Sequence, residues 1–79
     1  MQLSDERSRF LLQRRNSGLT SQQVAREAGL SLAEEYRAEI GCEVEADSAQ
    51  RLLEALGRLT GKPWTLHDAA IVVKQGGNL

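Results

Sequence analysis

The chain has 79 residues, of which 41% are hydrophobic and 27% charged, and its formal net charge is −1. This length allows one small domain, and the composition is that of a globular protein rather than a disordered or fibrous one. No apolar run reaches the roughly 20 residues that span a bilayer, the N-terminus MQLSDERSRF lacks the apolar region of a signal peptide, and one cysteine excludes an internal disulfide. We therefore expect a cytoplasmic protein that does not enter a membrane.

Charge is distributed unevenly along the chain. Residues 1–30 hold five arginines and three acids, whereas residues 31–60 hold three arginines and seven acids. The large basic excess that is typical of nucleic-acid-binding proteins is therefore missing overall. The first third is mildly basic and the middle is acidic.

Short polar caps and glycines predict the helix boundaries. A first helix is expected over residues 4–16, capped by Ser4, with Gly18 in the left-handed conformation after it. Thr20 begins a second helix, because Gln23 three residues later completes a capping box. Gly29 ends that helix after two turns.

The same signals predict two further helices. Ser31 and Glu34 form another capping box, which opens a third helix that Gly41 closes. After a loop at residues 42–46, Asp47 is expected to cap a leucine-rich fourth helix that ends at Gly57.

The C-terminal part leaves two alternatives open. Pro63 prevents the fourth helix from continuing, Trp64 is expected to cover the small core, and Thr65 with Asp68 begins a fifth segment. A helix face is suggested by Leu66, Ala69, Ala70 and Val73. The run AAIVV is rich in strand-forming residues, however, so a short C-terminal strand is the alternative within residues 66–74. The prediction is one domain over residues 1–75 with a flexible tail at 76–79.

Two short helices joined by A-G-L form a helix-turn-helix pattern. Ala25 must be small because the next helix crosses close over it, and Gly29 must lack a side chain because the turn needs a positive φ. With its flanks, this pattern resembles the Cro/phage-repressor (XRE-type) helix-turn-helix family. The residues that carry the resemblance are Arg14, Thr20, Val24-Ala25, Ala28-Gly29-Leu30, Glu39 and Gly41, followed by a leucine-rich helix ending in Leu56-Gly57.

The resemblance implies an all-α, lambda-repressor-like fold, a compact bundle of four to five short helices. It places Arg14 and Glu39 at a partly buried ion pair that ties the first helix to the third. In the family, the start of the third helix reads base edges and the start of the second holds phosphate. Carried onto this chain, the nucleic-acid-binding residues are Ser21, Gln22, Arg26, Ser31, Leu32, Ala33 and Arg37.

The chain also departs from the family at several positions. Glu35 stands where the family has a buried Ile or Val, and burying a charged carboxylate without a partner costs several kcal/mol. We therefore expect the third helix to shift so that Tyr36 fills the gap, with an inward stripe of Leu32, Ala33, Tyr36 and Ile40. The loop Cys42-Glu43-Val44-Glu45, often basic in the family, is acidic here and would repel phosphate.

Single candidates have more than one interpretation. Arg37 could read guanine, or it could pair with Glu34 on its own helix. The sequence holds no set of further Cys or His residues at metal-ligand spacing from Cys42 or His67, and no catalytic motif accompanies them. We therefore expect neither an enzyme nor a cofactor or metal site.

Two functions follow from these patterns. The first is a small DNA-binding transcriptional regulator of bacterial, plasmid or phage type, which binds the major groove of double-stranded DNA as a homodimer. The second is a protein-interaction module, such as an antitoxin, an anti-regulator or a phage adaptor, that meets a protein partner on the acidic face and does not bind DNA. Dimerisation is expected through the apolar C-terminal residues Leu66, Ala70, Ile71 and Val73.

Overall fold

The computed structural model describes residues 9–74, and within this range the secondary structure consists of five helices and one isolated β-bridge. The helices are α1 (Arg9–Asn16), α2 (Ser21–Ala28), α3 (Leu32–Glu39), α4 (Ala46–Thr60) and α5 (Leu66–Ala69). The predicted all-α bundle is therefore confirmed. The expected helix start at Ser4 and the expected tail at 76–79 lie outside the described residues.

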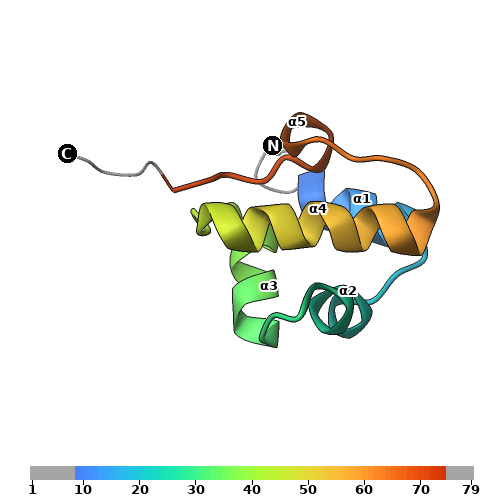
Figure 1. Cartoon of the computed structure of the whole chain (residues 1–79), viewed down its shortest axis with the longest axis horizontal. Helices are drawn as coiled ribbons and strands as arrows, with labels where there is room; N and C mark the ends of the chain where they lie inside the picture. The colour runs from blue at the N-terminus through green and yellow to red at the C-terminus, as the bar shows by residue number, and fades with distance from the viewer. Residues whose placement is uncertain (1–8, 75–79) are drawn as a thin grey trace, which may run out of the picture.

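The longest helix, α4, crosses the middle of the molecule (Figure 1). In that view α1 and α5 lie on one side of α4, and α2 and α3 lie on the other. The view runs nearly along the axis of α2 while α3 lies close to the plane of the picture, so the two helices meet at a steep angle. The α2–α3 pair therefore occupies one end of the molecule.

Side chains from all five helices meet in one apolar core. Its buried members are Phe10, Val24, Ala28, Ala38, Val44, Ala49, Leu52, Ala55, Leu56, Ala69 and Ile71. Burying a Leu or Phe side chain contributes about 1.5–3 kcal/mol. Trp64 packs half-buried against this core and donates a hydrogen bond from Nε1 to Thr60 Oγ1 at 2.8 Å, which confirms its predicted place as a cover.

The predicted boundaries of α4 were wrong at both ends. The helix begins at Ala46 after Glu45, which makes no side-chain capping bond, and Asp47 instead pairs with Arg51 one turn later. It passes through Gly57 and ends at Gly61, where φ is +79°. The extra turn brings Leu59 against the core, and this packing outweighs the cost of about 1 kcal/mol for glycine inside a helix.

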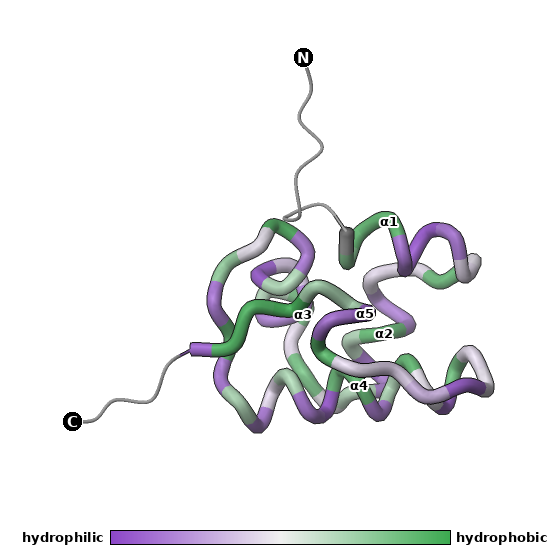
Figure 2. Tube along the Cα trace, turned by 90° about the horizontal axis from the view of Figure 1, so that it is seen from above, coloured by the Kyte–Doolittle hydropathy of each residue, from purple (hydrophilic) through white to green (hydrophobic). Residues whose placement is uncertain are grey.

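The C-terminal segment combines both predicted alternatives. One helical turn, α5, ends at Ala70, which adopts the left-handed conformation with φ +56°. The chain then runs extended through an apolar stretch (Figure 2) and forms a parallel bridge between Val73 and Val44. Val44 N donates to Val72 O at 2.9 Å, and Lys74 N donates to Val44 O at 2.7 Å. The segment therefore closes the core along the loop between α3 and α4.

Candidate nucleic-acid interface

Helices α2 and α3 form a helix-turn-helix in the geometric sense, with Gly29, Leu30 and Ser31 between them. Gly29 has φ +71° and its N–H bonds back to Ala25 and Arg26, as the turn requires. Ala25 is buried, in agreement with the expected close crossing. The sharp turn is therefore made by a residue without a side chain, which follows a small, buried residue of α2.

Both helices start with the predicted capping boxes. Thr20 Oγ1 accepts from Gln23 N at 3.1 Å, and Gln23 Oε1 accepts from Thr20 N at 2.8 Å. Ser31 and Glu34 repeat this exchange at 3.1 Å in each direction. Glu34 therefore caps its own helix, and this role explains why one of the acidic residues of α3 is present.

A buried polar cluster joins α1, α2 and α3. Arg14 Nε donates to Glu39 Oε2 at 2.8 Å, Arg14 Nη1 donates to Leu19 O at 2.8 Å, and Ser21 Oγ donates to Glu39 Oε2 at 2.7 Å. The predicted Arg14–Glu39 pair is confirmed as a contact. Ser21, predicted to hold phosphate, instead points inward and holds the first turn of α2 to the end of α3.

Glu35 lies on the side of α3 that faces the core. The predicted shift of the helix, which would have put Tyr36 in this place, does not occur. Its side chain is 0% exposed, whereas Tyr36 is 49% and Ile40 63% exposed, so the predicted inward stripe through these two residues was wrong. The prediction assumed a charged carboxylate. Burial, a hydrogen bond with Glu39 and the charge of Glu39 raise the pKa of Glu35 to about 9, and the protonated form is far less costly to bury.

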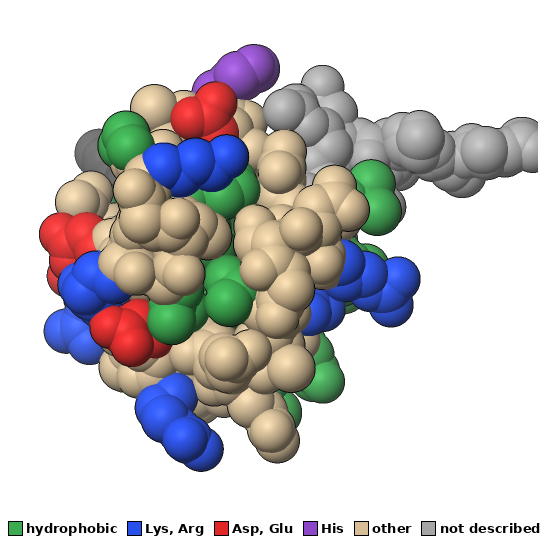
Figure 3. Space-filling view, turned by 90° about the vertical axis from the view of Figure 1, so that its right-hand side faces the viewer, with side chains coloured by type: hydrophobic (Ala, Val, Ile, Leu, Met, Phe, Trp, Pro, Cys, Tyr) green, Lys and Arg blue, Asp and Glu red, His purple; other side chains and the backbone are tan. Residues whose placement is uncertain are grey.

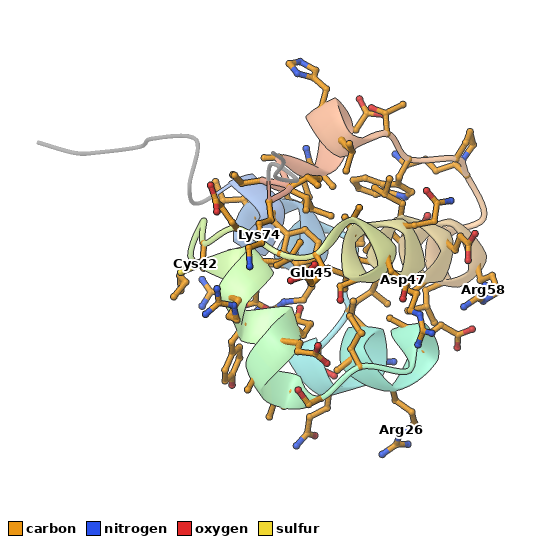
Figure 4. The ribbon with its side chains drawn as sticks, turned by 60° about the vertical axis from the view of Figure 1, so that its left-hand side comes forward. Arg26, Cys42, Glu45, Asp47, Arg58 and Lys74 are labelled. Atoms are coloured by element: carbon orange, nitrogen blue, oxygen red, sulfur yellow. The ribbon has the colours of Figure 1, made fainter. Side chains whose placement is uncertain are left out.

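The other predicted contact residues lie mostly on the outer side of the α2–α3 pair. Gln22 and Arg26 on α2, and Ser31, Ala33 and Arg37 on α3, are exposed, while Leu32 is half-buried. Figure 4 shows Arg26 pointing away from the body of the molecule at this end. The structure thus leaves five of these residues exposed, whereas Leu32 and Ser21 are half-buried.

Arg37 does not pair with Glu34, which excludes one of its two predicted interpretations within the described residues. Its Nη2 donates to the carbonyl oxygen of Glu43 at 3.1 Å, so the side chain is folded onto the loop after α3. Beneath it is a hollow of about 120 Å³, which we call the α3–α4 hollow. Its lining residues are Glu34, Arg37, Glu43, Val44, Glu45, Ser48 and Lys74.

The start of α4 contributes to this hollow and was missed in the sequence. Glu45 leaves the first N–H groups of α4 without a side-chain cap. Ser48, 8% exposed, lines the hollow and makes no side-chain hydrogen bond within residues 9–74. The bridge between Val44 and Val73 brings Lys74 to the hollow, where its Nζ lies 3.6 Å from Glu45 Oε2 (Figure 4). No local pattern in the sequence predicts this long-range contact.

The charged surface is mixed in sign rather than basic. Figure 3 shows Lys and Arg side chains interspersed with Asp and Glu on one face of the molecule. Several cations are engaged in ion pairs, among them Arg51 with Asp47 at 3.0 Å and Arg58 with Glu27 at 2.6 Å. Any attraction for phosphate must therefore come from few residues.

Residues 9–74 contain no helix long and apolar enough to cross a membrane. The same residues bring no three His, Cys, Asp or Glu side chains together as a metal site, and Cys42 is a half-buried free thiol.

Comparison of the chain with protein-family models, curated proteins and solved structures finds no match. The geometry of the α2–α3 end and the chemistry of its surface are therefore the features from which a function is inferred.

Proposed function

We propose that the chain is a small transcriptional regulator that binds double-stranded DNA through α2 and α3. The observation that carries the proposal is the way these helices are held. Arg14, Ser21 and Glu39 fasten them from behind, so the outer sides of both remain accessible at one end of the molecule. An α-helix fits the major groove of B-DNA, and a rigid pair of helices can hold it there.

In this proposal the contacts divide between the two helices. Gln22 and Arg26 on α2 face the phosphate backbone, where Arg26 supplies the charge. Ala33 and Leu32 begin α3 and can contact thymine methyl groups, but they offer no hydrogen bonds to base edges. Arg37 is the one side chain on the outer face of α3 that can pair with guanine, and it must first leave the carbonyl of Glu43.

The start of α4 offers a second contact to the backbone. Uncapped N–H groups at a helix start attract anions, and the hydroxyl of Ser48 lies beside them. Three carboxylates of the α3–α4 hollow, on Glu34, Glu43 and Glu45, oppose this attraction. We therefore expect modest affinity that depends strongly on salt.

A regulator of this size would act as a two-fold dimer whose α3 helices enter successive major grooves. The predicted C-terminal surface is reduced, since Ile71 belongs to the core of its own chain and Ala70 and Val73 are half-buried. Leu66 and Val72 remain exposed on this segment, each at 42%. These two residues carry the dimer proposal.

The test is a fluorescence-anisotropy titration of the full chain against labelled duplex DNA of random sequence at low salt. Binding that weakens in Arg26→Ala, and is unchanged in Lys62→Ala, is the expected result. Lys62 loses the same charge but lies on the α4–α5 connection, near Trp64. Equal binding by both variants would place the DNA contact elsewhere, and no binding by the unchanged chain would remove the proposal.

A second function is favoured by one observation, the apolar outer side of α3. Tyr36 and Ile40 lie one turn apart and are both about half exposed or more, on the helix that supplies Glu34 and Arg37 to the α3–α4 hollow. Such a surface suits a protein partner with an apolar centre and basic flanks. If no duplex binds at low salt, this function takes precedence, and Ile40→Asp is the variant expected to abolish capture of a candidate partner.

A further inference from the structure

The buried carboxyl group of Glu35 receives no hydrogen bond from the rest of the bundle. Neither of its oxygens accepts one from any donor of residues 9–74. Natural proteins rarely leave buried polar groups in this condition, and exceptions call for an explanation. The neighbour that supplies one is Glu39, which lies one turn later on the same helix.

Glu39 has the opposite environment. Its oxygens accept from Arg14 Nε at 2.8 Å, from Arg14 Nη2 at 3.4 Å and from Ser21 Oγ at 2.7 Å. Burial alone would raise the pKa of Glu39, but hydrogen bonds from Glu35, Arg14 and Ser21 lower it. Glu39 is therefore the member of the pair that keeps its charge.

With Glu39 and Arg14 charged, the cluster is neutral only while Glu35 holds a proton. The charged groups that act on Glu35 are Glu39 on its own helix and Arg14 on α1, and α2 contributes only the uncharged hydroxyl of Ser21. A protonated Glu35 donates to Glu39, whereas an ionised one adds a second negative charge to a site with one arginine.

The position of α3 depends on this cluster to an unusual degree. Among the apolar core residues of the described chain, only Ala38 comes from α3. Glu35 and Glu39 therefore form much of the buried side of α3. Few apolar side chains of α3 could hold the helix in place without them.

We propose that the Glu35–Glu39 pair is a proton lock: one shared proton keeps α3 docked against α1 and α2, and its loss releases α3 while the rest of the bundle stays folded. The released helix would no longer present Arg37, Tyr36 or Ile40 in a fixed arrangement. Mildly alkaline conditions would thus turn off any function of the α3 surface. The lock concerns the position of α3 and does not require that the surface binds DNA.

The test is a pH titration of the full chain by NMR, with ¹³C-labelled glutamate and ¹⁵N-labelled backbone, from about pH 5 to about pH 10. The Glu35 carboxyl carbon is expected to titrate near pH 9, matching its raised pKa. Amide signals of residues 32–40 should shift or broaden at the same midpoint, while those of Leu52, Leu56 and Trp64 stay unchanged. Glu35→Gln keeps a donor toward Glu39 and cannot ionise, so its α3 signals should remain constant throughout.

Glu54→Gln, an exposed change on α4, is the matched control and should behave as the unchanged chain. The proposal is overturned if Glu35 titrates in the ordinary range of carboxyl groups, or if the α3 transition persists in Glu35→Gln. It is equally overturned if α3 and the core lose their signals together, because the released element would then be the whole fold. None of these outcomes depends on DNA binding, so the failure of one proposal is distinguishable from that of the other.

Discussion

Arg14 and Glu39 are 25 residues apart in the chain, and their side chains meet at 2.8 Å in a largely buried contact between α1 and α3. The same carboxylate takes the hydroxyl of Ser21 from α2. A single residue at the end of α3 thus holds three helices together. This junction sets the orientation of the α2–α3 pair together with the apolar packing of Val24, Ala28 and Ala38.

Removing the carboxylate of Glu39 should therefore be costly. Glu39→Ala leaves a buried guanidinium and the hydroxyl of Ser21 without their acceptor, and we expect a loss of about 2–4 kcal/mol in the free energy of unfolding. Glu43→Ala, an exposed change on the next loop, should change it by less than about 0.5 kcal/mol. Urea denaturation followed by Trp64 fluorescence measures both, and equal midpoints would contradict the assigned role of the junction.

Stability should fall as the pH rises above the ordinary range of carboxyl groups. In the unfolded chain Glu35 loses its proton near pH 4.5, whereas in the folded chain its pKa is about 9, so folding takes up a proton between these values. Between these two pKa values the free energy of unfolding therefore falls by at most about 1.4 kcal/mol per pH unit. The pKa of Glu39 is lowered on folding, so its contribution to stability is lost as the pH falls, under more acidic conditions than those that affect Glu35.

Glu35→Gln should remove this dependence. Because the amide needs no proton, the variant is expected to be more stable than the unchanged chain by roughly 3 kcal/mol at neutral pH, with the difference vanishing near the ordinary pKa of glutamate. Urea midpoints at a series of pH values provide the measurement. A variant that is less stable than the unchanged chain at neutral pH would show that Glu35 is buried in its charged form.

Backbone strain at Ala70 offers a separate test of the C-terminal segment. Ala70 is the one non-glycine residue with positive φ in the described chain, and the left-handed conformation costs such residues about 1–2 kcal/mol. Ala70→Gly should raise the stability by roughly 0.5–1 kcal/mol, since glycine adopts this conformation freely but loses more entropy on folding. The same change at Ala55, buried within α4, should lower the stability by about 1 kcal/mol or more.

Calorimetry of both variants distinguishes the two environments. For a domain of this size, 1 kcal/mol corresponds to a change in Tm of about 4–8 °C. A lower Tm in Ala70→Gly would mean that α5 does not end in this conformation.

Dimerisation through the C-terminal segment can be tested with a point variant. Truncation after Trp64 would remove Ala69 and Ile71 from the core and is therefore unsuitable. Val72→Asp places a charge on the exposed side of the segment and should convert a dimer into a monomer without loss of helix. Leu12→Asp, on an exposed position of α1, is the control. Sedimentation at micromolar concentration decides the matter, and a monomeric unchanged chain would remove the dimer.

Local signals predicted the α2–α3 end well because its boundaries depend on contacts between near neighbours. Thr20 with Gln23 and Ser31 with Glu34 exchange hydrogen bonds within one turn, so their effect can be read from the residues alone. Gly29 likewise acts through its own backbone. The Arg14–Glu39 contact is long-range and was predicted only through the resemblance to a family.

The errors arose where distant packing decides the structure. Gly57 lies inside α4 because Leu59 gains burial beyond it, and no local signal records that gain. The inward stripe of α3 was misplaced because Glu35 was treated as charged, whereas its protonation depends on the partners that Glu39 finds on α1 and α2. Ser48 and Lys74 enter the α3–α4 hollow through the bridge between Val44 and Val73, which joins segments far apart in sequence.

The most direct test of the proposed function is the salt dependence of duplex binding. If Arg26 neutralises one phosphate per subunit in a dimer, the slope of log K against log salt should be about −2. Arg26→Ala should make that slope shallower by about 2 for every sequence, since it removes one contact from each subunit. Arg37→Ala should lose about 1–3 kcal/mol of preference at one base pair in each half-site. An unchanged chain that binds no duplex at low salt would contradict the proposal and leave the Tyr36–Ile40 side of α3 as a protein-binding surface.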